Sequence, residues 1–124
     1  MRKDKLYYIE KYVMLCGSLC KVATDYTRAK VKKHNKAMQQ LILLEEELSG
    51  EIGLAEEVYD SLLNSTDNYV RQSAATDCLR FNIHTERAIA VLEYICANGE
   101  RMAAMGADRI LRIWRGELDP SKPF

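Results

Sequence analysis

The sequence predicts an all-α fold, and three observations support this prediction. Apolar residues recur at spacings of three and four along most of the chain, which is the period of an amphipathic helix. No run of alternating β-branched residues competes with that period, and only two prolines and six glycines interrupt it. The 124 residues, of which 48% are hydrophobic, are enough to form a core. We therefore expect one domain, residues 1–124, of about six helices.

The first half of the chain predicts a helical pair over residues 1–49, followed by a shorter third helix. The first helix covers about residues 3–23, with a core stripe of Leu6, Ile9, Val13, Cys16, Cys20 and Ala23. Thr24 or Asp25 caps the second, which reaches about Leu48 and buries Ala37, Met38, Leu41, Leu44 and Leu48. The third covers about residues 51–63 and buries Leu54, Ala55, Val58 and Leu62.

The second half predicts three more helices. The fourth covers about residues 68–81 and follows a turn that ends in the cap residue Asp67, and the fifth is capped by Thr85 and ends at Asn98. The sixth covers about residues 100–115 and buries Met102, Ala103, Ala107, Ile110, Leu111 and Trp114, with Gly116 at its C-terminal cap. Residues 119–124 form a tail. Because the connections are short, neighbouring helices are expected to be antiparallel, as three stacked helical hairpins.

Charge is segregated along the chain, although its sum is zero. Residues 1–36 hold ten basic and three acidic residues, a net of +7, and residues 37–70 hold eight acidic and no basic residues, a net of −8. Residues 71–124 hold eight basic and seven acidic residues, a net of +1. Like charges three and four positions apart repel on a helix. The middle segment is therefore expected to form an exposed acidic corner.

This acidic corner is the candidate partner-binding site. The expected contact residues are five carboxylates and two tyrosines, namely Glu46, Glu47, Glu56, Glu57, Tyr59, Asp60 and Tyr69. The tyrosines are included because this residue is enriched among interface hot spots. Complementary charge raises association rates and selects partners, so a basic protein surface is the expected partner. The alternative is a solvated face, partly neutralised by the basic first segment, with the tyrosines half-buried in packing.

An ordered set of motifs occupies residues 67–118. It contains Val70, Arg71, Ala74, Ala75 and Leu79, then Ala88 and Leu92, then Ala107, Leu111, Trp114, Arg115 and Gly116. The pattern D-x-x-V-R-x-x-A-A resembles the second helix of a HEAT repeat, in which small alanines let paired helices approach closely. Residues 51–118 are accordingly expected to form two HEAT-like repeats.

The whole set resembles a bacterial family of HEAT-like helical proteins known as domain of unknown function number two thousand nineteen. Members of that family resemble partners in toxin–immunity loci and bring no catalytic residues. The resemblance implies an immunity protein of contact-dependent inhibition that binds a cognate toxin. Together with the acidic corner, it predicts a nuclease toxin whose basic active-site cleft is covered. The alternative function is a non-catalytic structural adaptor or a homo-oligomeric helical scaffold.

Enzyme and metal chemistry find little support in the sequence. His34 and His84 are the two histidines, no glycine-rich loop is present to hold phosphates, and a nucleophile needs a base beside it. We therefore expect no enzyme and no cofactor. Cys16 and Cys20 would share one helix face as a conceivable metal half-site, but buried free thiols are the preferred interpretation, so no metal is expected.

Nucleic acid and membrane are also disfavoured as partners. A basic run, Arg28, Lys30, Lys32, Lys33, His34 and Lys36, is the alternative nucleic-acid site. Zero net charge and a single interleaved aromatic, Tyr26, argue against it. The longest apolar run, residues 41–44, is far shorter than the ~20 residues that a membrane-spanning helix needs. No apolar signal-peptide segment follows the basic start, so a cytoplasmic location is expected.

Overall fold

The computed structural model describes residues 4–22 and 28–117, with the side chains of residues 4–19 and 32–117. Six helices occupy these residues: α1 (Lys5–Val22), α2 (Arg28–Ser49), α3 (Ile52–Leu63), α4 (Asn68–Phe81), α5 (Thr85–Asn98) and α6 (Arg101–Trp114). The all-α prediction is confirmed. The predicted caps Thr24 and Asp25, the side chains of Cys20 and Ala23, and the tail at 119–124 lie outside the described residues.

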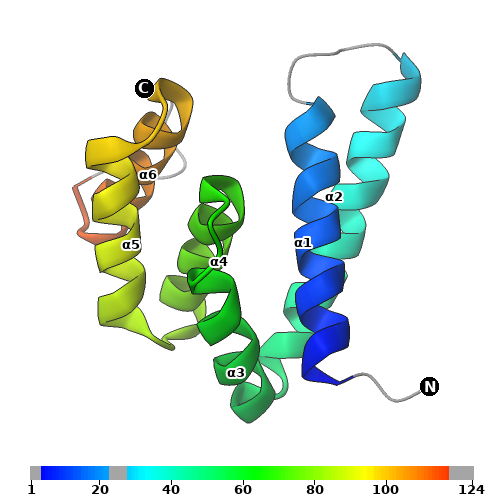
Figure 1. The fold of residues 1–124 in the computed structure, drawn as a ribbon, viewed down its shortest axis with the longest axis horizontal. Helices are drawn as coiled ribbons and strands as arrows, with labels where there is room; N and C mark the ends of the chain where they lie inside the picture. The colour runs from blue at the N-terminus through cyan, green and yellow to red at the C-terminus, as the bar shows by residue number, and fades with distance from the viewer. Residues whose placement is uncertain (1–3, 23–27, 118–124) are drawn as a thin grey trace. The chain divides into compact units, whose positions relative to one another are not determined.

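The chain forms two compact units, Met1–Leu62 and Leu63–Phe124, and each is described by itself. In the first unit α1 and α2 lie side by side and run in opposite directions (Figure 1). The buried stripe of α1 consists of Tyr8, Tyr12, Leu15, Cys16 and Leu19. Leu6 and Val13 are exposed, so the predicted stripe is wrong at these two positions. Both sides of α1 are apolar, and the side that is buried carries the two large tyrosine rings, which cover more surface.

The core of the first unit is completed by α2 and α3. Ala37, Leu41, Leu44 and Leu48 of α2 are buried as predicted, together with Ala55, Val58, Tyr59 and Leu62 of α3. Met38 is exposed, and that prediction is wrong, because it lies beside the buried stripe and not on it. The rings of Tyr12 and Tyr59 meet edge to face, with their centroids 6.0 Å apart. This contact joins α3 to the first helical pair, and the first unit extends to Leu62 in the last turn of α3.

The second unit contains α4, α5 and α6, each of which packs against the other two. Small and branched residues form its core: Val70, Ala74, Ala75, Ala88, Leu92, Ile95, Ala107 and Leu111 are all buried. The helices approach closely at Gly106, where an added Cβ would lie 2.5 Å from the Nε2 atom of Gln72. Figure 1 shows α5 and α6 as neighbouring antiparallel helices.

The start of α4 has a side-chain cap, whereas the start of α5 has none. The Asp67 carboxylate accepts a hydrogen bond of 2.8 Å from the Tyr69 N–H, which confirms the predicted cap. The N-cap position of α5 is His84, whose φ is 47° and whose side chain makes no capping hydrogen bond. Thr85 is therefore the first helical residue and not the cap. Gly116 follows α6 with a φ of 78°, a conformation that glycine adopts at little cost.

Fewer residues of α6 are buried than the sequence predicts. Ala107 and Leu111 are buried, but Met102 is 81% exposed and Trp114 is 43% exposed. The predicted burial of these last two residues is wrong. Among the described residues of its unit, α6 packs against α4 and α5, and it buries Ala107 and Leu111 while both of its ends stay exposed.

Candidate functional site

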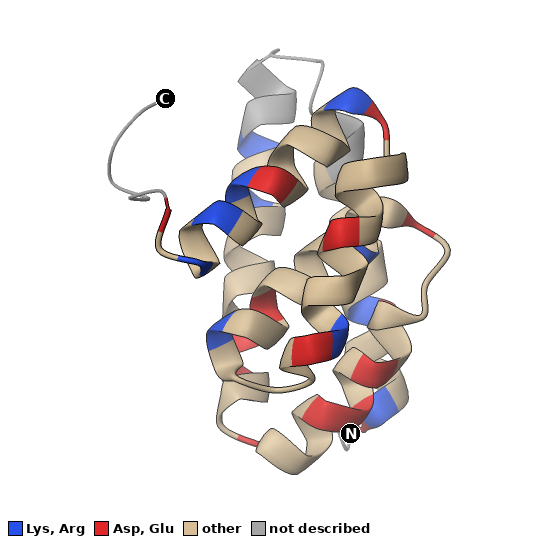
Figure 2. Cartoon of the chain, turned by 90° about the vertical axis from the view of Figure 1, so that its left-hand side faces the viewer, with Lys and Arg blue, Asp and Glu red and all other residues tan. Residues whose placement is uncertain are grey.

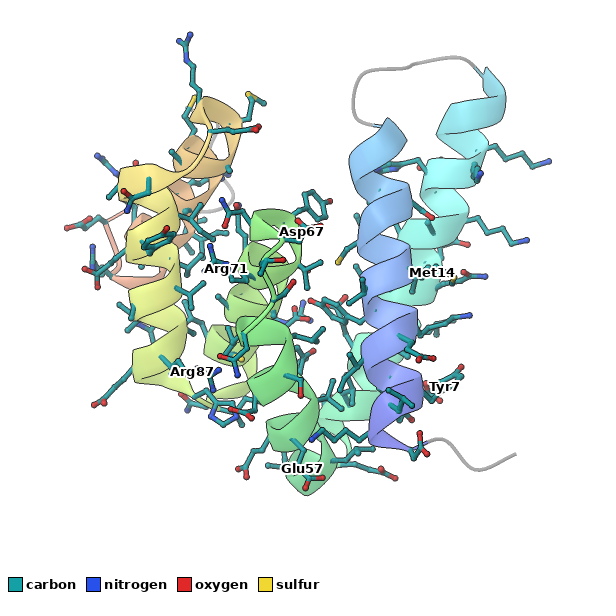
Figure 3. The ribbon with its side chains drawn as sticks, viewed as in Figure 1. Tyr7, Met14, Glu57, Asp67, Arg71 and Arg87 are labelled. Carbon is teal, nitrogen blue, oxygen red and sulfur yellow. The ribbon has the colours of Figure 1, made fainter. Side chains whose placement is uncertain are left out.

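Three carboxylates lie on the exposed side of α3. Glu56, Glu57 and Asp60 are exposed, whereas Val58 and Tyr59 on the opposite side are fully buried. Figure 3 shows Glu57 on the outside of the helix. The spacing of three and four residues between Asp60 and the two glutamates places all three on one surface, called the α3 acidic face below.

Glu46 and Glu47 lie on the exposed side of the last turns of α2, in the same unit. A tight turn links them to α3: the N–H of Gly50 donates to the carbonyl of Glu47 at 3.2 Å, and the Ser49 hydroxyl donates to the carbonyl of Glu46 at 2.7 Å. All five predicted carboxylates are therefore exposed in the first unit. Glu45, their neighbour, is buried and does not belong to this surface.

The two predicted tyrosines differ in burial and in the unit to which they belong. Tyr59 is fully buried against Tyr12, so the prediction that it contacts a partner is wrong: its position in the helical repeat faces the core. Tyr69 is 41% exposed and lies in the first turn of α4, in the second unit. Its backbone N–H donates to the capping carboxylate of Asp67.

In the described residues of the second unit, opposite charges lie close together. Figure 2 shows basic and acidic positions interspersed on the helices that face the viewer. Two exposed ion pairs tie opposite charges together, Arg112 with Asp108 at 2.9 Å and Arg115 with Glu93 at 3.8 Å. The Arg71 guanidinium lies over the ring of Tyr94, 5.1 Å from its centroid, and so connects α4 with α5 (Figure 3).

The described residues offer no obvious reactive centre. No group of three or more His, Cys, Asp or Glu side chains is placed to hold a metal ion among those described. Cys78 is fully buried, and burial together with the nearby Asp77 carboxylate raises the pKa of its thiol from 9.0 to about 12. A thiol in that state remains protonated at neutral pH and is a poor nucleophile.

The structure also reveals exposed apolar residues that the sequence analysis did not select. Ile42 and Leu43 of α2 are 46% and 60% exposed. A signal for them exists in the sequence, because residues 41–44 form an unbroken apolar run and an amphipathic helix can bury only about half of such a run. No helix in the described part of the chain is both long enough and apolar enough to cross a membrane.

Comparison with protein-family models, with curated proteins and with solved structures found no match to the chain. The resemblance to the HEAT-like family therefore depends on the motifs of residues 67–118 alone.

Proposed function

We propose that the chain is a non-catalytic immunity protein that neutralises a cognate bacterial toxin by binding it through the α3 acidic face. The observation that supports this function is the exposed set Glu56, Glu57 and Asp60, within a segment that has no basic residue from 37 to 70. Glu46 and Glu47 add two further exposed carboxylates at the end of α2. The resemblance of residues 67–118 to toxin–immunity partners supplies the class of partner.

The chemistry of this face suits a nuclease toxin. A nuclease holds phosphates in a cleft of positive potential, and a row of carboxylates presents the same sign of charge as the phosphates it replaces. Fields of this kind raise association rates about 10- to 1,000-fold. Inhibition would then be steric, because a helix seated over the cleft excludes the substrate.

The test begins by capturing the partner from host-cell extract on the tagged chain and purifying both proteins. Binding is then measured by biolayer interferometry for the wild type and for the double variant Glu56→Lys/Glu57→Lys. We expect one stoichiometric basic partner with nuclease activity that the wild-type chain inhibits. The double variant should reduce the association rate at least tenfold in low salt.

A matched control is Glu10→Lys/Glu117→Lys, which makes the same change in net charge at two exposed positions outside this face. It should bind nearly as well as the wild type, and both double variants should keep their helical circular dichroism. Equal losses in the two double variants would indicate a general charge effect and refute the α3 acidic face. A partner without toxic activity would refute the immunity function, but the α3 acidic face would still be supported as a binding surface.

A second candidate function is a structural adaptor. Met102 and Met105 of α6 are 81% and 60% exposed, and flexible methionines are common on surfaces that bind several partners. Binding through them would be insensitive to salt. Replacing both with Ser would reduce capture of an adaptor's partners, whereas capture through the α3 acidic face would be unaffected.

A further inference from the structure

The exposed side of α2 carries a graded stripe. Lys32, Lys36, Gln39, Leu43 and Glu46 follow one another at steps of four, three, four and three residues, and all five are exposed. These steps keep the five side chains on one side of a helix. The opposite side is buried, at Ala37, Leu41, Leu44 and Leu48. The stripe therefore runs from basic, through amide and apolar, to acidic.

Apolar side chains lie in the stripe and beside it. Leu43 is 60% exposed, Ile42 next to it in the sequence is 46% exposed, and Met38, one turn before Ile42, is 38% exposed. A single exposed leucine is ordinary on a protein surface, but a contiguous apolar group rimmed by charges is typical of a contact site. Within the described part of the first unit, neither α1 nor α3 covers these three side chains.

We propose that two copies of this chain pair antiparallel through the exposed stripe of α2, with the twofold axis at Gln39. Lys32 and Glu46 lie seven residues on either side of Gln39, about 10 Å along the helix at 1.5 Å per residue. An antiparallel arrangement therefore places Lys32 of each copy opposite Glu46 of the other. The Gln39 amides, each with a donor and an acceptor, meet at the axis.

The order of charges along the stripe favours a second copy of this chain as the partner, in antiparallel orientation. A parallel pair would set lysine against lysine and glutamate against glutamate, at a cost in free energy. An isologous interface must be self-complementary, and a stripe with opposite charges at equal distances from its centre meets that condition. The Lys36 stem would lie over Ile42 of the facing helix, while its ammonium group remains in water.

The stripe is small for a protein interface. Residues 32–46 extend over roughly 21 Å of helix, and one helix face buries less than the ~800 Å² per partner of a standard interface. We therefore expect a weak dimer that forms at high protein concentration. Since its outer contacts are exposed ion pairs, it should weaken as salt rises.

The experiment is sedimentation velocity on the purified full chain over a range of concentrations, at low and high salt. The wild type should shift from monomer to dimer as concentration rises at low salt. Lys32→Glu and Glu46→Lys should each abolish the shift, because each sets like charges against one another in both symmetric contacts. The double variant Lys32→Glu/Glu46→Lys should restore it, because the reversed charges are again complementary.

Two further variants sharpen the result. Leu43→Ser should weaken the dimer at every salt concentration by removing an exposed apolar side chain from the stripe. Glu10→Lys on α1 should leave it unchanged. A wild type that stays monomeric at low salt would overturn the proposal, as would a double variant that fails to recover. Circular dichroism of each variant establishes that the helices are intact.

Discussion

Replacement of Tyr59 with Ala tests whether this residue belongs to the core or to a contact surface. Its side chain is fully buried and its ring meets Tyr12 edge to face, 6.0 Å between centroids. Removing a fully buried aromatic ring costs about 3–5 kcal/mol of unfolding free energy. Of this loss, about 0.5–1.5 kcal/mol belongs to the aromatic pair itself.

The assay is urea unfolding followed by far-ultraviolet circular dichroism, with Tyr94→Ala as the matched control. Tyr94 is 53% exposed, and its one described ring contact is with the Arg71 guanidinium, so its loss should cost about 1 kcal/mol or less. A double-mutant cycle on Tyr12 and Tyr59, each replaced with Leu, should give a coupling of roughly 1 kcal/mol. If Tyr59→Ala and Tyr94→Ala cost the same, Tyr59 is not a core residue and the reasoning fails.

Three other substitutions have defined outcomes. In the folded chain the pKa of the Cys78 thiol is raised from 9.0 to about 12. The unfolded chain therefore loses this proton first, and the free energy of unfolding should fall as pH rises from 9 towards 12. In thermal melts over this pH range, Cys78→Ala should flatten that decline. Asp67→Ala removes the hydrogen bond to the Tyr69 N–H and should cost about 1 kcal/mol in urea unfolding. Gly17→Ala should raise the unfolding free energy by about 0.5–1 kcal/mol, because alanine favours the helix and an added Cβ would have no atom within 4 Å. A loss of stability would instead show that another part of the protein covers this side of α1.

The helix limits were predictable where local chemistry sets them. The sequence predicted α4 at residues 68–81, and the structure gives Asn68–Phe81, because Asp67 supplies a cap within the turn itself. At α5 the same reasoning predicts the cap at Thr85, one residue after the actual N-cap position, His84. There the backbone turns through left-handed conformations at Asn82 and His84, and no side-chain oxygen marks the helix start.

The buried faces were less predictable than the helices. In α1 the stripe containing Leu6 and Val13 and the stripe containing Tyr8 and Tyr12 are both apolar, and periodicity gives no preference between them. The packing partner decides: Tyr59 of α3 meets Tyr12 and so selects the tyrosine side. The sequence analysis places Tyr59 in the acidic corner because its neighbours in the sequence are acidic, whereas in the structure its ring lies on the core side of α3, next to Val58.

Apart from Glu46, which borders both, the two proposed surfaces lie on different helices of the first unit and should act independently. Glu56→Lys/Glu57→Lys changes the α3 acidic face and should lower partner affinity without changing the wild-type dimerisation curve. Leu43→Ser changes the α2 stripe and should weaken the dimer without changing the rate at which a monomer binds the partner. Interferometry at concentrations below dimerisation, together with sedimentation velocity, separates the two effects. If Leu43→Ser also slowed partner binding to the monomer, one continuous surface would serve both contacts, and Glu46 at its border would be the residue they share.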